Sequence, residues 1–175
     1  SGRNLSGQTI EDFWTSVEHA RPLAVGLNCG MGAAEVRPYV QRLSEIADTR
    51  ILCYPNAGLP NALGQYEQTP AQMSELLGEF ARAGLLNLVG GCCGTTPDHI
   101  RQIAAAVRGL EPRRIAAPVR RTRFAGLEPF EIRPETNFVM IGERTNITGS
   151  KRFARLIESD AYEKAAEVAA HRMRQ

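Results

Sequence analysis

The sequence predicts an α/β fold, because strand-like and helical segments alternate along its first 110 residues. Apolar segments at residues 23–29, 50–54 and 85–89 are expected strands, and an amphipathic helix pattern follows each of them. Such alternation produces a parallel sheet with right-handed crossovers. Since a closed barrel needs about eight strand–helix units, we expect residues 1–110 to form the C-terminal portion of a (β/α)8 TIM-type barrel.

Each expected helix has apolar residues at helical spacing, which should face the sheet. One helix precedes the first strand, and three follow the strands in turn. Their apolar positions are Ile10, Phe13, Trp14 and Val17; Val36, Val40, Leu43 and Ala47; Met73, Leu76, Leu77 and Phe80; and Ile100, Ile103, Ala104 and Val107.

Two adjacent cysteines, Cys92 and Cys93, lie between glycines where the third strand should turn into a helix. Thr96 suits the N-cap of that helix and Pro97 its first position. Backbone N–H groups and the helix dipole favour thiolates at such a turn. A disulfide between neighbouring cysteines would close a strained ring, so metal ligation is the better hypothesis.

A third ligand is needed, and Cys29 is the best candidate because it also ends an apolar strand. The carboxyl ends of parallel strands meet at one edge of a sheet, where the chemistry of such folds usually lies. The alternative is that Cys29 is simply a small buried apolar residue. Cys53, in the middle of a strand, should be buried structure.

The composition of the chain argues against several classes of function. The chain has 175 residues, 43% of them hydrophobic, and a net charge of +2, which predicts neither nucleic-acid nor membrane binding. Apolar runs stay well short of a membrane span, and the polar N-terminus lacks a signal-peptide pattern. Four cysteines, two of them adjacent, fit a reducing compartment, so we expect a cytoplasmic protein.

After residue 110 the pattern changes. Residues 111–136 hold four prolines and six arginines without a clear period, which indicates a linker. The arginines suit either a phosphate-binding patch or a solvated linker with salt bridges. A second strand–helix unit should then follow, with a strand at 138–141, a polar turn at 142–150, and helices at 152–158 and from 162 onward.

At this point the motifs support a family resemblance. The segment Gly-Gly-Cys-Cys-Gly-Thr-Thr-Pro at 90–97 resembles the zinc motif of homocysteine methyltransferases. Gly-Leu-Asn-Cys at 26–29 and Pro-Asn-Ala-Gly-Leu-Pro-Asn at 55–61 also match, and betaine- and S-methylmethionine-dependent enzymes share the cysteine pattern. Residues 142–150, Gly-Glu-Arg-Thr-Asn-Ile-Thr-Gly-Ser, more narrowly resemble the opening of the folate domain of cobalamin-dependent methionine synthases.

The resemblance implies three regions: the C-terminal part of a homocysteine- and zinc-binding barrel (1–110), a linker (111–136), and the first strand–helix unit of a second, folate-binding (β/α)8 barrel (137–175). It also implies functional residues. The family's zinc cysteines fall on Cys29, Cys92 and Cys93, and Asn56 matches an asparagine that fills the open zinc position when substrate is away. Glu143, Arg144 and Asn146 match the start of the folate site. From composition alone, these three suit either a site for a polar heterocycle or a capped loop.

The implied activity is that of a 5-methyltetrahydrofolate–homocysteine S-methyltransferase. Such enzymes pass the methyl group of 5-methyltetrahydrofolate through methylcobalamin to zinc-activated homocysteine, which yields methionine. The cobalamin-binding module would belong to the same full-length protein but lie outside this chain, so we expect the isolated chain to be inactive. The alternatives are a cobalamin-independent methyltransferase of the betaine or S-methylmethionine type, a structural zinc module, or a redox protein that uses the adjacent cysteines.

Overall fold

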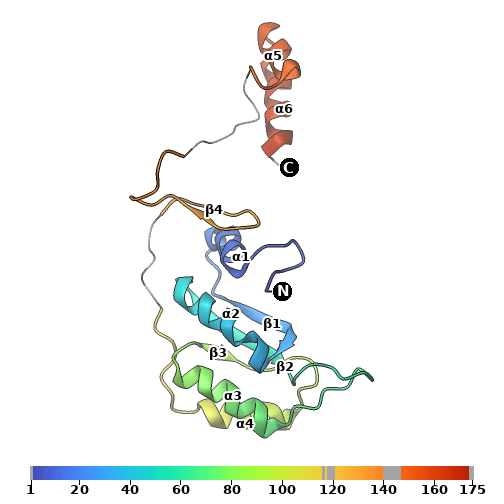
Figure 1. Ribbon diagram of the computed structural model, residues 1–175, viewed down its shortest axis with the longest axis vertical. Helices are drawn as coiled ribbons and strands as arrows, with labels where there is room; N and C mark the ends of the chain where they lie inside the picture. Colours follow the sequence, from blue (N-terminus) through green and yellow to red (C-terminus); the bar gives the residue numbers. More distant parts are fainter. Residues whose placement is uncertain (1, 116, 118–120, 140–146, 174–175) are drawn as a thin grey trace. The chain divides into compact units, whose positions relative to one another are not determined.

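The computed structural model describes residues 2–115, 117, 121–139 and 147–173 (Figure 1). The chain divides into two compact units, Ser1–Arg133 and Pro134–Gln175. Among the described residues, no helix is both long enough and apolar enough to span a membrane.

The first unit contains a three-stranded parallel sheet in the order β1-β2-β3. Its strands are β1 (Ala24–Gly32), β2 (Arg50–Asn56) and β3 (Leu88–Val89). The prediction of a parallel α/β fold is therefore confirmed for this unit. The last strand is shorter than expected, because the side chain of Asn87 takes part in the pairing: its Oδ1 accepts the Ile51 N–H at 2.9 Å.

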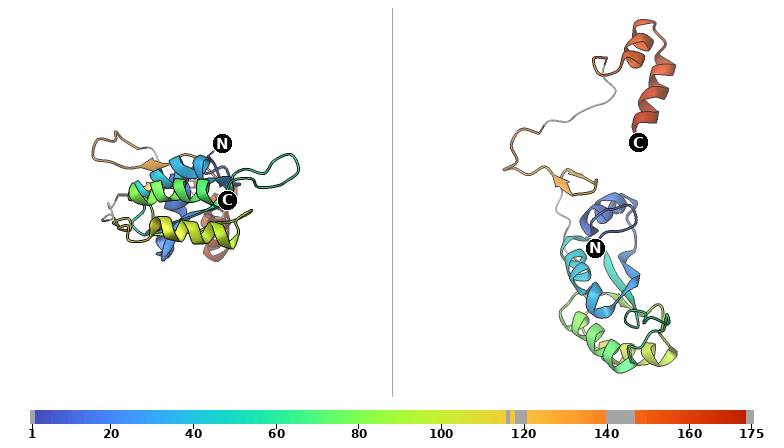
Figure 2. Two further views of the ribbon diagram at one scale, coloured as in Figure 1. Left: turned by 90° about the horizontal axis from the view of Figure 1, so that it is seen from below. Right: turned by 45° about the vertical axis from the view of Figure 1, so that its right-hand side comes forward.

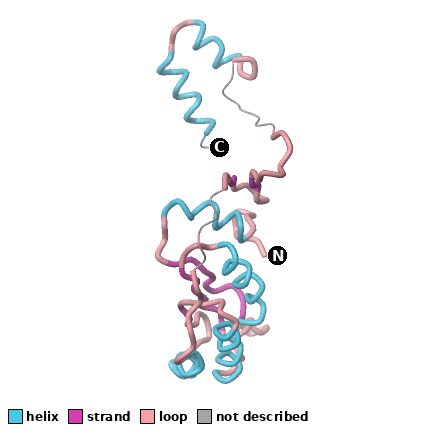
Figure 3. Tube along the Cα trace, turned by 90° about the vertical axis from the view of Figure 1, so that its left-hand side faces the viewer, coloured by secondary structure: helices cyan, strands magenta, loops and turns pink. Residues whose placement is uncertain are grey.

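Helices accompany the sheet in chain order. They are α1 (Ile10–Val17) with the 3-10 turn η1 (Glu18–Ala20), α2 (Ala33–Ile46), α3 (Pro70–Arg82) and α4 (Pro97–Val107). α2 packs on β1 and β2, while α1 packs on α2, α2 on α3, and α3 on α4 (Figures 2 and 3). Consecutive helices that neighbour one another beside parallel strands are the arrangement found in an arc of a (β/α) barrel.

The core lies between these helices and the sheet. The expected inward residues of α2 are all buried, and so are Met73, Leu77 and Phe80 of α3. In α4 the expected stripe is partly wrong, because Ile100 is exposed while His99 and Ile103 are buried. The helix is rotated so that Ala106 meets Gly78 of α3, and this close helix contact outweighs the simple apolar spacing.

Part of the expected linker is ordered structure. β4 (Arg123–Phe124) and β5 (Phe130–Glu131) form an antiparallel hairpin that contacts α1. Its turn is held by the buried Asp12, whose carboxylate accepts the Gly126 N–H at 3.1 Å. Several arginines make ion pairs, which favours the salt-bridge interpretation over a phosphate patch: Arg123 with Glu18, and Arg121 and Arg133 with Glu131.

The second unit contains α5 (Lys151–Glu158) and α6 (Tyr162–Met173), which pack together. The Ser150 hydroxyl caps α5 by accepting the Phe153 N–H. Phe138 and Val139, the described half of the expected 138–141 strand, are not in a strand. The other half, and Glu143, Arg144 and Asn146, lie outside the described residues, so the expected folate site and second barrel stay predictions.

Candidate metal centre

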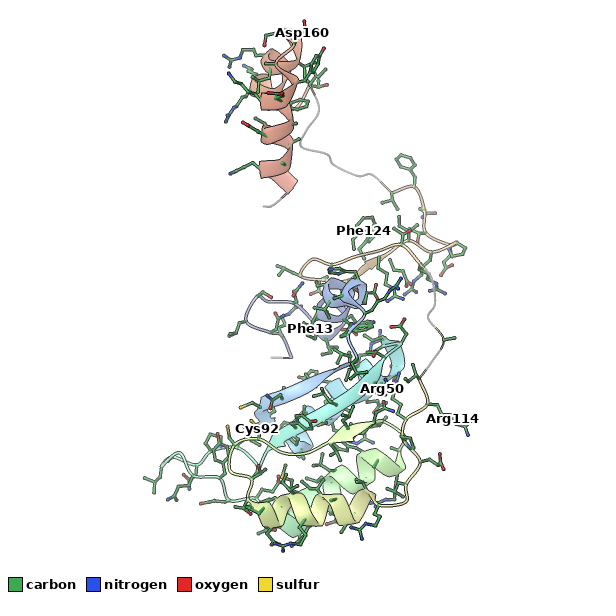
Figure 4. The ribbon with its side chains drawn as sticks, turned by 180° about the vertical axis from the view of Figure 1, so that it is seen from behind. Phe13, Arg50, Cys92, Arg114, Phe124 and Asp160 are labelled. Carbon is green, nitrogen blue, oxygen red and sulfur yellow. The ribbon has the colours of Figure 1, made fainter. Side chains whose placement is uncertain are left out.

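Three thiols meet at the carboxyl end of the sheet. Cys29 lies near the end of β1, and Cys92 and Cys93 lie in the turn after β3. The Sγ atoms of Cys29 and Cys93 are 3.4 Å apart, those of Cys92 and Cys93 are 3.8 Å apart, and all three lie within 4.8 Å of one another. Figure 4 labels Cys92 at the end of the sheet opposite Arg50, the first residue of β2.

The backbone of β1 is distorted where it presents Cys29. The pairing with β2 is in register up to Asn28 and resumes only at Gly32. Cys29 itself has φ 66° and Gly30 has φ 76°. A non-glycine residue in this left-handed region costs about 1 kcal/mol or more, so the surrounding structure holds Cys29 in a strained conformation at the point where its thiol meets the other two.

The turn that carries Cys92 and Cys93 is bonded along its length to the end of β2. The Cys92 N–H donates to the Pro55 carbonyl at 2.8 Å, and the Ala57 N–H donates to the Cys93 carbonyl at 2.9 Å. The Thr95 hydroxyl donates to the Cys92 carbonyl at 2.6 Å. These bonds hold the backbone that carries both thiols.

Asn56, the last residue of β2, lies beside the cluster and is only 3% exposed. Its Oδ1 accepts the Cys93 N–H at 3.2 Å. In this structure the amide therefore orients the cysteine pair. Its predicted role as a ligand in the open metal position stays a prediction.

The thiols differ in acidity. The neighbouring Cys93 thiol and the Gly30 backbone lower the pKa of Cys29, whereas interaction with Cys29 raises the pKa of Cys92. One thiolate is thus stabilised by the thiols around it. Cys53 is fully buried away from the cluster, and burial raises its pKa to about 12. The expectation that Cys53 is buried structure is confirmed.

The donor set fits a zinc ion. Tetrahedral zinc with Zn–S bonds of about 2.3 Å holds two sulfurs about 3.8 Å apart, close to the observed 3.4 and 3.8 Å. Soft thiolates also favour zinc over magnesium or calcium. Within the described ranges, these three cysteines are the group identified as able to hold a metal ion. Three ligands leave one position open, as in catalytic zinc sites.

Two residues near the cluster were not predicted from the sequence. Tyr66, in the loop before α3, lies against Gly94, the residue after Cys93. No local pattern marks it. His99 is buried in the first turn of α4, and its position three residues after the Thr96 N-cap, where a capping box has Glu or Gln, was an available signal.

The first unit resembles an arc of a (β/α) barrel, and three thiols lie together at the carboxyl ends of its strands. These two features define the class as a candidate metal-binding protein with thiolate ligands. Residues 1–107 match the family model of the homocysteine S-methyltransferases. This match covers more than half of the chain, which therefore belongs to the homocysteine S-methyltransferase family.

A solved structure is also similar, the oxidized form of the homocysteine methyltransferase MmuM from Escherichia coli. The two sequences are 24% identical, with a TM-score of 0.45 over 56% of this chain. The match covers 30% of the MmuM chain, so this chain spans less than a third of that protein's length.

Proposed function

We propose that this chain forms the metal-binding part of an enzyme that transfers a methyl group to the sulfur of homocysteine. The observation that carries the proposal is the cluster of Cys29, Cys92 and Cys93, whose partly exposed thiols lie within 4.8 Å of one another. A zinc ion bound there would lower the pKa of an incoming homocysteine thiol and keep its sulfur nucleophilic.

The residues of the chain have separate tasks in this proposal. The three thiolates would hold the metal ion, and their combined charge would keep the site electron-rich. The Cys93 N–H is fixed by Asn56, so the pair of cysteines needs little reorganisation to bind. The partial exposure of the thiols leaves one side accessible to a substrate thiol.

The competing interpretations make different predictions about metal. A structural zinc module usually has four protein ligands, whereas the described residues offer three. A redox protein would cycle its thiols without metal. A stable complex with one zinc and an accessible fourth position therefore favours the methyltransferase proposal over both alternatives.

Metal content of cysteine variants tests the ligand set. We expect one zinc per chain in the reduced protein, and loss of most of it in Cys29→Ala, Cys92→Ala and Cys93→Ala. Cys53→Ala is the matched control, because Cys53 is buried away from the cluster and should keep full zinc content. Zinc loss from Cys53→Ala together with retention in Cys29→Ala would contradict the assignment.

Zinc-edge X-ray absorption tests the open position. Adding homocysteine should raise the number of sulfur ligands from about three to about four, because only an open site gains a ligand. Methionine is the matched control, since it carries no thiol to deprotonate. An unchanged sulfur count with homocysteine would indicate a closed, structural site.

We further propose that the methyl donor system is that of the cobalamin-dependent methionine synthases. The support is the sequence at 142–150 and the start of a separate compact unit at Pro134. In this proposal residues 1–110 serve homocysteine, residues 137–175 open the folate barrel, and a module elsewhere in the full-length protein binds methylcobalamin. The structural unit boundary at 133/134 lies three residues before the proposed start of the folate region.

Measuring the two half-reactions of the full-length protein distinguishes 5-methyltetrahydrofolate from betaine or S-methylmethionine as the methyl donor. Asn146→Ala should slow methyl transfer from 5-methyltetrahydrofolate to cobalamin while leaving transfer from methylcobalamin to homocysteine nearly unchanged. Glu163→Ala, at an exposed position of α6 outside this motif, serves as the control. Full activity with betaine or S-methylmethionine, and none with methylcobalamin, would contradict the cobalamin proposal and leave the zinc proposal intact.

A further inference from the structure

A series of hydrogen bonds connects the cysteine turn to the loop at residues 58–69, here called the thiol-side loop. The Ala57 N–H donates to the Cys93 carbonyl, and the Gln68 N–H donates to the Ala57 carbonyl at 3.1 Å. The Gln68 carbonyl in turn lies 2.9 Å from His99 Nε2. The loop is therefore bonded at its end both to Ala57, the residue after β2, and to α4, the helix that follows the cysteine pair.

His99 makes its connection with a defined tautomer. Its Nδ1 lies 3.2 Å from the Thr96 backbone nitrogen and 2.9 Å from the Thr96 hydroxyl. A backbone N–H can only donate, so Nδ1 is the acceptor and Nε2 carries the proton. Nε2–H then donates to the Gln68 carbonyl. His99 as a whole is only 5% exposed, and its hydrogen bonds are partly buried.

The thiol-side loop places Tyr66 beside the cysteine pair. A Cβ added at Gly94 would collide with Tyr66 Cβ, which shows how closely the tyrosine approaches the turn. Burial and the neighbouring sulfur of Cys93 raise the pKa of the Tyr66 phenol, in agreement with this proximity. Gly94 has φ 77°, so both the backbone conformation and the tyrosine require glycine there.

We propose that His99 is a positioning residue of the metal centre: it fixes the thiol-side loop so that Tyr66 covers Cys93. This inference extends the proposed function, because a covered thiolate exchanges its metal and meets reagents more slowly. Removing a residue that contacts and orients the metal ligands, without binding the metal itself, commonly lowers metal affinity about 10-fold or more.

The variant His99→Gln separates positioning from helix capping. α3 begins with the same arrangement, in which the Gln72 side chain accepts the Thr69 N–H at 2.9 Å. Glutamine at position 99 can therefore cap α4 in the same way, but it lacks the second ring nitrogen that reaches Gln68. Thr9→Ala, which removes a cap from the distant α1, controls for general loss of stability.

The first measurement needs no metal. In reduced, metal-free protein, the iodoacetamide reaction of each cysteine is followed by peptide mass spectrometry. In His99→Gln, Cys93 should react about fivefold faster, the effect expected for loss of one net hydrogen bond, while Cys53 stays protected. Unchanged Cys93 reactivity, or an equal increase at Cys53, would overturn the proposal.

A double-mutant cycle with Tyr66→Ala tests the route of the effect. Tyr66→Ala should also expose Cys93. Combining it with His99→Gln should add little further exposure, because both substitutions act by removing the Tyr66 ring from Cys93. Additive effects would overturn the proposal. In zinc-loaded protein, His99→Gln should release zinc to a chelator about 10-fold faster. If the wild type binds no zinc, the proposed function fails, while the alkylation result still decides the role of His99.

Discussion

At the scale of single residues, the local environment of each cysteine decides whether it is a candidate metal ligand or a buried core residue. Cys29 sits in a backbone distortion where a neighbouring thiol and the Gly30 backbone lower its pKa. Cys53, one strand away, pairs in regular register with Leu27 and is fully buried. The difference arises because strand ends leave the sheet's hydrogen-bonding pattern, whereas mid-strand residues are enclosed by the core.

The order of thiol reactivity follows from these environments. In reduced, metal-free protein near neutral pH, Cys29 should be alkylated faster than Cys92, since the thiolate is the reactive form. Cys53 should react only after unfolding. Time-resolved alkylation with peptide mapping measures all the rates in one experiment. Faster labelling of Cys53 than of Cys29 in the folded protein would contradict the environments described.

Burial of Cys53 also predicts how stability depends on pH. Its pKa is raised from 9.0 to about 12, so between these values the unfolded chain releases a proton that the folded chain retains. The contribution of Cys53 to the free energy of unfolding is therefore fully present below about pH 9 and is lost as the pH rises toward about 12. Denaturant unfolding should show this loss in the wild type and a flatter profile in Cys53→Ala. Parallel profiles would contradict it.

At the scale of secondary-structure elements, one buried arginine closes the end of α2. The Arg113 guanidinium donates to the carbonyls of Ser44, Ala47 and Thr49, at distances from 2.6 to 3.0 Å. These acceptors lie at and just after the helix C-terminus, where carbonyls lack helical partners. Burial lowers the pKa of Arg113, but the several bonds keep its charge satisfied. A residue of the expected linker thus belongs to the core.

Arg113→Ala should lower the free energy of unfolding by about 3 kcal/mol, because a charged donor shared among buried carbonyls is lost. Arg113→Lys should recover only part of this, since an ammonium lacks the planar fork. Chemical denaturation measures both. The exposed neighbour Arg114 is the matched control, and its alanine variant should change stability by about 0.5 kcal/mol or less. Equal effects at the two positions would contradict the capping role.

At the scale of the whole molecule, all three thiols of the candidate metal centre lie in the first compact unit. A chain ending at Arg133 keeps the sheet, its helices and the β4–β5 hairpin. It should therefore bind zinc with the same stoichiometry and the same affinity, within about a factor of three, as the 175-residue chain. A truncation at Glu111, which also removes Arg113, is the contrast and should be markedly less stable. Loss of zinc from the 1–133 chain would contradict the independence of the two units.

The sheet also has unpaired edges within the part of the chain that is described. β1 pairs with β2 alone, and the neighbouring Leu23 is 76% exposed. Open edges promote association through strand pairing. The 175-residue chain studied by itself should show a sedimentation-average mass that rises with concentration, and Leu23→Lys should reduce the rise. A monodisperse monomer at high concentration would contradict this expectation.

The sequence by itself determined the alternation of strands and helices, most helix positions and the candidate ligands Cys29, Cys92 and Cys93. These features depend on local spacing, caps and the common edge of parallel strands, all of which are visible in nearby residues. Tertiary structure alone decided the short β3, the rotation of α4, the hairpin on Asp12, and the long-range contacts of Arg113, His99 and Tyr66. Those features depend on contacts between residues far apart in the chain. Asn87 Oδ1 accepts the Ile51 N–H, His99 reaches the Gln68 carbonyl, and Arg113 reaches the Ser44 carbonyl. No local pattern specifies which distant group each of these side chains will meet.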